Sequence, residues 1–384
     1  MRIAFLLRYW PYYGGGETVT RVLIEEFLKR GIDIHVLYWW NRNEGRNFNP
    51  SGNYYEYKFN MPESNSYNPE GDISWLKDEL TDYLYSNKID FVINQWWPVG
   101  LIASNQDTTI IRCWHTNVIP HIGKSNNVIK NIYHYIFKNE IYRNYIKKHV
   151  ENYYMESDLY VFLADAYVKE FCKYSTLYPQ EGKKITYINN PLTYSSVPEI
   201  ELNKKKNEIV FVGRIEESVK RISRILYSWK NILEKGIEDW TLYIIGDGPD
   251  LEEMRILAEE LGLKNVIFTG SKDPRENYLT ASILLLTSDM EGWPMTIVEG
   301  KSYGVVPLIM NTYSAAKEVV QHEHDGLVCD STSISEFSKM LLSLINNSAI
   351  REKYAKEAIV DAKKYHVENI VDQWMKLFHE YKKK

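Results

Sequence analysis

The sequence has few of the features that mark secreted, metal-binding and membrane-spanning proteins. Its three cysteines, Cys113, Cys172 and Cys329, lie far apart and form no C-x-x-C pair. This predicts buried thiols in a reducing compartment rather than disulfides or a zinc site. No stretch reaches the roughly 18 apolar residues that a membrane span needs, and the first apolar run, residues 3–7, is too short for a signal peptide. We therefore expect a cytoplasmic protein.

An excess of positive charge and a complete dinucleotide motif are also missing. The formal net charge is −5, which argues against a general nucleic-acid binder. The run Gly14-Gly15-Gly16 lacks the G-x-G-x-x-G spacing, and Leu251 stands where a third glycine would follow Gly246-x-Gly248. The second expected strand ends without an acidic residue to hold an NAD ribose. An NAD-dependent dehydrogenase is therefore disfavoured.

What the sequence does contain is the alternation of an α/β protein. At 384 residues the chain exceeds what one hydrophobic core usually supports, so we expect two domains. A buried strand at 2–7, a glycine-rich loop, an amphipathic helix at 17–29 and a strand at 32–39 form a first βαβ unit. The pattern stops between 190 and 207, which places the interdomain linker there, and restarts at 208.

The most informative stretch is 284–307, LLLTSDMEGWPMTIVEGKSYGVVP. It predicts a buried strand, a turn containing Glu291, and a helix with Pro294 in its first position and Glu299 inside. The helix starts at the carboxyl end of its strand, where open α/β sheets bind ligands, and its free N–H groups favour a phosphate. The two carboxylates would repel phosphate but can accept hydrogen bonds from hydroxyls. Together these features indicate a nucleotide sugar as ligand.

The pair Glu291-x7-Glu299, with the E-G-W-P turn and the following S-Y-G-V-V-P-L-I, resembles the signature of the retaining nucleotide-sugar glycosyltransferases of family four. The pair alone is common by chance, so its context carries the resemblance. It implies a GT-B fold, in which two Rossmann-like parallel-sheet domains face each other across a cleft and the C-terminal helix crosses back to the N-terminal domain. We expect an acceptor-binding domain at 1–195, a nucleotide-sugar domain at 196–365, and the crossing helix at 366–384.

The resemblance also implies roles for cations. Arg214, directly after Gly213, and Lys220 are expected to face the donor diphosphate and to act catalytically. One extra residue separates them compared with the usual form of the motif, so Arg221 is the alternative to Lys220. No Asp-x-Asp motif is present, and we expect a metal-independent reaction that uses no cofactor, with fixed cations and helix N–H groups stabilising the leaving diphosphate.

The remaining implied roles concern hydroxyls and turns. Glu299 is expected to accept from the ribose, Glu291 from the donor sugar, and His115 to hydrogen-bond that sugar from the other domain. A catalytic His115 and a purely structural one are about equally supported. Further donor contacts are expected from turns and the helix start: Gly15, Gly16, Gly213, Gly246, Gly248, Ser271, Gly292, Trp293, Pro294, Met295 and Thr296.

A basic, aromatic-rich segment at 124–150 stands out in an acidic chain. It carries Lys124, Lys130, Lys138, Arg143, Lys147 and Lys148 against one acidic residue, Glu140, with apolar residues at helical spacing. Two alternatives remain open. Either this amphipathic helix lies on an anionic membrane surface, which would make the protein peripheral at the inner face of the membrane, or it packs on its own sheet with its lysines in water.

The expected function is a retaining glycosyltransferase of hexosyltransferase type. It would move a sugar from a nucleoside diphosphate sugar, with UDP-sugars favoured, to a hydroxyl of a glycan or lipid-linked acceptor in bacterial surface polysaccharide or glycoconjugate synthesis. No nucleic-acid partner is expected. The alternative is a non-catalytic GT-B scaffold subunit that binds a nucleotide or glycan within a glycosylation complex.

Overall fold

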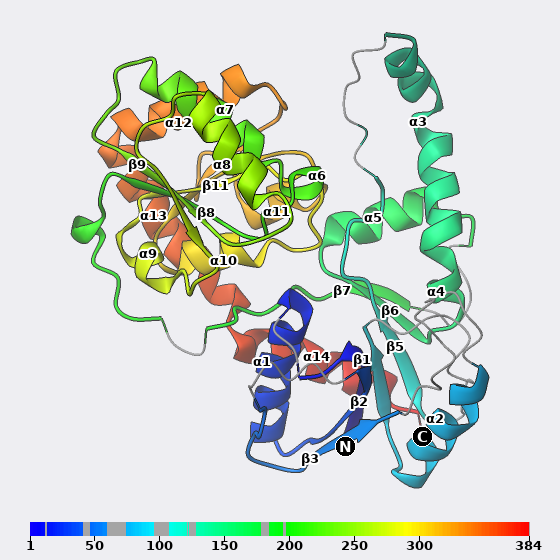
Figure 1. Ribbon diagram of the computed structural model, residues 1–384. Coiled ribbons are helices and arrows are strands. Elements are labelled where there is room, and N and C mark those ends of the chain that lie inside the picture. Colours follow the sequence, from blue (N-terminus) through cyan, green and yellow to red (C-terminus); the bar gives the residue numbers. More distant parts are fainter. Residues whose placement is uncertain are drawn as a thin grey trace. The chain divides into compact units, whose positions relative to one another are not determined.

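The computed structural model describes residues 1–11, 14–40, 47–59, 74–95, 107–120, 122, 128–177, 184–194 and 197–383. Contacts divide the chain into two compact units: Met1–Thr193 with Val367–Lys384, and Tyr194–His366. Each unit is a parallel sheet covered by helices (Figure 1). No helix among the described residues combines the length and the hydropathy that crossing a bilayer requires.

The first unit contains a seven-stranded parallel sheet in the order β3-β2-β1-β4-β5-β6-β7. Its strands are β1 (Arg2–Tyr9), β2 (Asp33–Trp40), β3 (Tyr54–Lys58), β4 (Phe91–Asn94), β5 (Thr109–Cys113), β6 (Leu159–Phe162) and β7 (Lys184–Tyr187). Its helices are α1 (Gly15–Lys29), α2 (Ser74–Ser86), α3 (Val128–His149), α4 (Glu151–Met155), α5 (Asp165–Tyr174) and α14 (Val367–Tyr381). Strand β3 lies at one edge of this sheet.

Strand β1 is apolar and buried from Ile3 to Leu7 because both of its faces are covered there. Side chains alternate across a strand, so Ala4 and Leu6 point to the same face, where they join the core cluster that includes Leu76 and Leu80 of α2. Phe5 points to the opposite face, where its ring lies 6.3 Å from that of Phe27 on α1. This is the continuous hydrophobic pattern that a central parallel strand requires.

The C-terminal helix α14 returns to the first unit, as the sequence predicted. The Phe378 ring lies 5.8 Å from Phe27 of α1 and 4.6 Å from Phe91 of β4. At the rim, Arg30 forms an ion pair with Asp372 at 2.5 Å. The apolar face of α14 therefore closes the core over α1 and the centre of the sheet.

The second unit contains a six-stranded parallel sheet in the order β10-β9-β8-β11-β12-β13. Its strands are β8 (Glu208–Val212), β9 (Thr241–Ile245), β10 (Val266–Gly270), β11 (Ile283–Leu286), β12 (Val306–Met310) and β13 (Leu327–Cys329). Its α-helices are α6 (Glu217–Lys220), α7 (Ile222–Leu233), α8 (Leu251–Glu260), α9 (Arg275–Thr280), α10 (Met295–Ser302), α11 (Ala316–Val319), α12 (Ile334–Asn346) and α13 (Ser348–Ala362). Two 3-10 turns complete it, Leu202–Lys204 and Lys363–Tyr365.

Two local expectations need correction, and one helical region is divided. Pro294 is the residue that caps α10, and the helix itself begins at Met295. The region around Lys220 forms two helices, because Arg221 takes a left-handed conformation (φ +53°) that breaks the helical path between α6 and α7. Helix α1 begins at Gly15, two residues before the expected start at 17.

Candidate functional site

The candidate site lies at the carboxyl edge of the second sheet, outside β8 and β11. These strands are neighbours in the sheet but not in the sequence, and the chain leaves them toward opposite sides. Such a switch point leaves a crevice between the two connecting loops, which is where open parallel sheets bind ligands. The loops concerned are 213–221 after β8 and 287–294 after β11, and the turn 246–250 after β9 lies beside the first.

Glycines allow the backbones of the loops after β8 and β9 to approach each other closely. Gly246 has φ +146°, and a Cβ built on it would collide with the carbonyl oxygen of Gly213. A Cβ on Gly248 would collide with the carbonyl oxygen of Ile215 in the same way. The Ile215 N–H also donates to the Asp247 carbonyl at 2.8 Å. These predicted ligand-binding glycines therefore have a structural task of their own, since no larger residue fits where the two backbones meet.

The loop after β8 is also bound to the turn after β11, through ion pairs. Lys220 Nζ lies 2.6 Å from Glu291 Oε1, and the two side chains are 22% and 10% exposed. Arg221 Nε lies 2.5 Å from one oxygen of Asp289, and Arg224 Nη1 lies 2.6 Å from the other. The structure thus brings the predicted pair Lys220 and Glu291 together.

Asp289 and Arg224 were missed by the sequence reasoning. Arg224 follows Arg221 by one helical turn, and Asp289 precedes Glu291 by two residues, but neither spacing indicates a partner about 65 residues away. Asp289 engages both guanidinium groups, so Arg221, the alternative cation, is tied to this carboxylate. Among the described residues, no cluster of acidic, histidine and cysteine side chains is arranged to hold a metal ion.

The other predicted cation is oriented differently. The Arg214 side chain is 67% exposed, and its ion pair is with Glu216, two residues along, at 3.3 Å. An exposed pair of this kind is weak, so the guanidinium is available to an anion arriving at the edge of the sheet. Ser271, which follows β10 at the same edge, is also exposed.

The start of α10 supplies further donors. Among the described residues, no acceptor is recorded for the backbone N–H groups of Met295 and Thr296, which is usual for the first turn of a helix. The Trp293 side chain is buried, with its ring 5.3 Å from that of Tyr365. A ligand at this edge could therefore contact the backbone of Gly292, Trp293 and Pro294. The indole of Trp293 is part of the core.

Glu299 is a buried carboxylate surrounded by tyrosines. It is 8% exposed, and burial, followed by the charge of Glu299, raises the pKa of Tyr278 well above its usual value. The Tyr278 hydroxyl donates to the carbonyl of Thr296 at 3.4 Å. Burial and the same carboxylate also raise the pKa of Tyr194. Both phenols remain donors at all ordinary pH values. The sequence reasoning missed these tyrosines, because nothing in their spacing relates them to α10.

In the first unit, predicted residues lie at the carboxyl edge of its own sheet. Gly15 opens α1, and a Cβ on it would meet no atom within 4 Å. The Thr20 hydroxyl lies 2.8 Å from the Gly16 carbonyl oxygen and 2.9 Å from Gln95 Oε1 after β4, so its one proton can be donated to either acceptor. Gly15 and Gly16 belong to a different unit from the pair Lys220 and Glu291, so their approach to one ligand stays a prediction.

His115 follows β5 and is held as a neutral imidazole. Burial, and secondarily the charge of Arg112, lowers the pKa of His115 to about 3. Arg112 is itself buried, donates to Asn94 at 2.9 Å and stacks over the Tyr153 ring at 4.0 Å. This arginine is a further residue that the sequence reasoning missed. A neutral His115 can hydrogen-bond a hydroxyl but cannot serve as an acid near pH 7.

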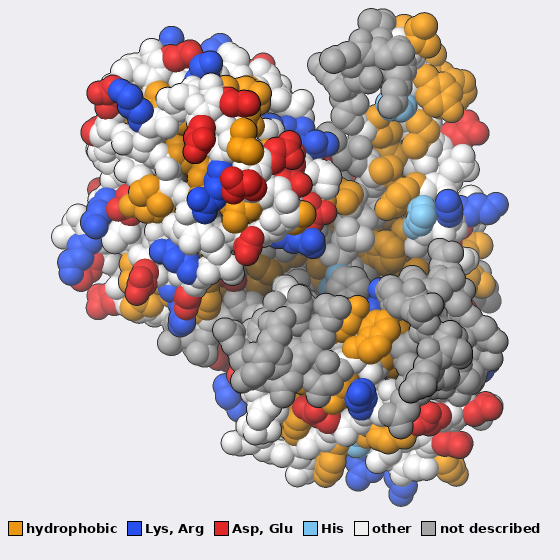
Figure 2. All heavy atoms as spheres, in the orientation of Figure 1, with side chains coloured by type: hydrophobic (Ala, Val, Ile, Leu, Met, Phe, Trp, Pro, Cys, Tyr) orange, Lys and Arg blue, Asp and Glu red, His pale blue; other side chains and the backbone are white. Residues whose placement is uncertain are grey.

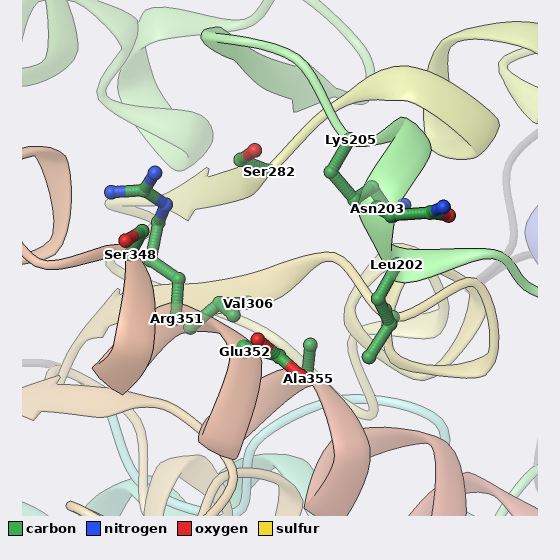
Figure 3. Close-up of a pocket in the computed structure, with 10 residues that line it drawn as sticks. Leu202, Asn203, Lys205, Ser282, Val306, Ser348, Arg351, Glu352 and Ala355 are labelled. Carbon is green, nitrogen blue, oxygen red and sulfur yellow. The ribbon is translucent and has the colours of Figure 1, made fainter.

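A cavity of about 220 Å³ lies at the opposite, amino edge of the second sheet, lined by Lys205, Ser282, Val306 and Arg351 among others (Figure 3). Lys205 donates to the Tyr278 carbonyl at 2.6 Å, and Arg351 donates to the carbonyl of Ile345 at 2.8 Å. Each cation thus caps the carboxyl end of a helix. The two cations that line this cavity therefore have structural roles. The cavity is separate from the candidate site.

Comparisons with known proteins match part of this chain to glycosyltransferases. Residues 195–361 match the family model described as Glycosyl transferases group 1. An uncharacterized glycosyltransferase of Haemophilus influenzae is 29% identical over 204 residues, covering 52% of this chain and 57% of the relative. The amylovoran biosynthesis glycosyltransferase AmsD of Erwinia amylovora is 30% identical over 173 residues, covering 44% and 48%. The match thus spans about half the length of these curated relatives.

Solved structures of similar fold cover nearly the whole chain. The Anabaena protein HepE, crystallised with UDP and glucose, superposes with a TM-score of 0.69 at 14% identity and covers 99% of this chain and 100% of its own. WaaG, described as a glycosyltransferase involved in lipopolysaccharide biosynthesis, gives 0.66 at 16% identity and covers 98% and 99%. At these identities the likeness concerns the fold, which is GT-B-like, as the sequence predicted.

Proposed function

We propose that this chain is a retaining glycosyltransferase of the glycosyl transferases group 1 family, whose model matches residues 195–361. It moves a sugar from a nucleoside diphosphate sugar, with UDP-sugars favoured, to a hydroxyl of a glycan or lipid-linked acceptor. Relatives with a matching segment include a lipopolysaccharide 1,6-galactosyltransferase of Salmonella typhimurium and AmsD. Their names support bacterial surface polysaccharide synthesis as the setting.

The barrier to this reaction lies in breaking the bond between sugar and phosphate, which leaves negative charge on the departing diphosphate. Fixed cations and helix N–H groups stabilise that charge without having to reorganise. Arg214, exposed at the edge of the sheet, and Lys220 supply the cations. The N–H groups at the start of α10 and the dipole of that helix add partial positive charge at the same edge.

The contact between Lys220 and Glu291 places a cation for the donor phosphates beside a carboxylate for the donor sugar. At 2.6 Å the ammonium and the carboxylate neutralise each other, so both can be held in a partly buried position. A bound donor would exchange this contact for two others: phosphate oxygens would take Lys220, and sugar hydroxyls would donate to Glu291. Arg221 does not share this role in the proposal, because Asp289 engages it.

The remaining residues bind and orient. Glu299 accepts from the ribose hydroxyls, and its buried position beside Tyr278 fixes where the carboxylate lies. His115 in its neutral form hydrogen-bonds the donor sugar rather than protonating it. The acceptor hydroxyl loses its proton to the departing diphosphate, so no protein side chain is assigned as the base.

The observation that carries the proposal is the contact between Lys220 and Glu291, four residues before the start of α10 and within the segment that matches the family model. The test has two stages with purified protein. A thermal-shift screen with UDP- and GDP-sugars identifies the donor, because a ligand that binds only the folded state raises the melting temperature. Slow hydrolysis of that donor, abolished in Lys220→Ala, is the expected result. Binding without hydrolysis or transfer would instead favour the scaffold alternative.

A further inference from the structure

Helix α3 has two halves with opposite environments. In its second half Tyr142 and Ile146 are buried, as is Val150 just beyond the helix, at a spacing of four residues. The Tyr142 ring lies 5.3 Å from Tyr174 of α5. This half is therefore anchored to α5 of its own unit, whereas the packing alternative from the sequence placed the segment on its sheet. Where the structure describes side chains between 129 and 141, none is buried.

The first half of α3 carries an apolar stripe that packs on nothing in the described structure. Ile129, Ile132, Tyr133, Ile136 and Phe137 follow the i, i+3, i+4, i+7, i+8 spacing of a core-facing helix. They are nevertheless between 40% and 78% exposed. Figure 1 shows α3 extending well beyond the sheet of its unit, and Figure 2 shows hydrophobic side chains gathered along it. An exposed stripe of this size on a projecting element is typical of a docking surface.

Charge indicates what this surface docks on. Lys138, Arg143, Lys147 and Lys148 are exposed, and among the described residues none of them forms an ion pair with a carboxylate. Arg143 and Lys147 lie on the same helix face as the stripe, further toward the anchored half, as the helical spacing shows. Glu140 is the single acidic residue of the helix. Apolar and tyrosine side chains at the tip followed by cations match the acyl boundary and headgroups of an anionic bilayer.

We propose that the stripe on α3 (residues 129–137) inserts into the surface of an anionic membrane and that Arg143 and Lys147 contact its headgroups. The inference rests on the surface of the first unit and does not depend on the proposed sugar transfer. Under this proposal the basic segment 124–150 has two parts, one that inserts into the membrane and one that is anchored to the protein. Residues 124–127 lie outside the described part of the chain and take no part in the argument.

Co-sedimentation with vesicles tests the proposal, using neutral phosphatidylcholine and mixtures with phosphatidylglycerol. The double variant Ile132→Asp/Ile136→Asp removes two exposed apolar side chains and should lower the partition coefficient for anionic vesicles by about tenfold or more, given the transfer free energy of such side chains. The matched control is Ile256→Asp, at a position that is 49% exposed on α8 in the second unit. It should bind as the wild type does.

The electrostatic part has its own variant. Arg143→Glu/Lys147→Glu should lose the preference for anionic vesicles, and wild-type binding should weaken as salt rises, because salt screens surface charge. Donor-induced thermal shifts should be unchanged in all four proteins, which separates this test from the proposed catalysis. Equal binding to neutral and anionic vesicles, no binding to either, or loss of a concentration-dependent dimer in Ile132→Asp/Ile136→Asp would each overturn the proposal. The last result would make a second copy the occupant of the stripe.

Discussion

Replacing Lys301 by methionine should destabilise the second unit strongly, because this ammonium is completely buried on α10. Its Nζ lies 2.8 Å from Asp325 and 2.6 Å from Asp361, and the side chains of Lys301 and Asp325 are both 0% exposed. It also donates to the Val319 carbonyl at 2.8 Å. Removing one partner of a buried ion pair leaves uncompensated charge, which costs roughly 3–5 kcal/mol. We expect about 4 kcal/mol for Lys301→Met.

The chain offers a matched control. Lys317 lies 2.7 Å from Asp330, the same ion-pair geometry, but these side chains are 55% and 67% exposed. Exposed pairs contribute about 0–1 kcal/mol, so Lys317→Met should be nearly silent. In thermal unfolding, Lys301→Met should lower the melting temperature of this unit by roughly 8–16 °C, on the scaling for domains of this size. Equal small shifts in the two variants would refute the reasoning that burial decides the magnitude.

The same cluster predicts a pH dependence. Burial opposes ionisation of Asp361, but the charge of Lys301 and hydrogen bonds from Lys301 and Lys364 outweigh it, so the pKa of Asp361 is lowered. A lowered folded-state pKa gives stability that is present above the unfolded pKa, roughly 3.9, and is lost as pH falls through the folded value. The wild type should therefore lose stability below about pH 4 more steeply than Asp361→Asn. Parallel acid unfolding curves for the two proteins would contradict this.

Three further predictions concern the candidate site. Arg214→Ala and Lys220→Ala should each reduce turnover by about 10²-fold or more, with wild-type activity unaffected by EDTA; activity that disappears in EDTA and returns with magnesium would exclude the metal-independent scheme. In calorimetric titrations free UDP or GDP should bind more weakly to Glu299→Gln, which loses the ribose contact, and at least as tightly to Glu291→Gln, where Lys220 no longer has a carboxylate to leave. The reverse order would mean that the two roles are exchanged. In Gly15→Ala the added Cβ meets no atom within 4 Å, so the melting temperature should be unchanged. A fall in turnover of this variant would indicate that a ligand approaches Gly15 closely. Unchanged kinetics would make Gly15 an ordinary turn residue.

The sequence by itself determined the elements and their class. Apolar runs predicted strands at 2–7 and 32–39, within two residues of the observed bounds of β1 and β2, because a buried parallel strand must be apolar on both faces. The E-x7-E context predicted the turn and helix that hold Glu291 and Glu299, and the family resemblance that it carries implied a last helix that packs back on the first domain. These are local patterns, and local sequence contains their periodicity directly.

Tertiary structure alone decided which side chains meet. Arg221 and Asp289 are 68 residues apart in the sequence, and Lys220 and Glu291 are 71 residues apart. Each pair meets because β8 and β11 are adjacent in the sheet. The hydrophobic periodicity of a strand does not indicate which strand lies beside it. The same limit applies to Tyr278 beside Glu299 and to Gly246 against Gly213. For α3 the sequence indicated a helix with an apolar stripe. Whether other residues cover that stripe depends on how far the helix extends past its sheet. Burial is a property of the assembled fold, so a stripe that packs and a stripe that stays exposed look alike in the sequence.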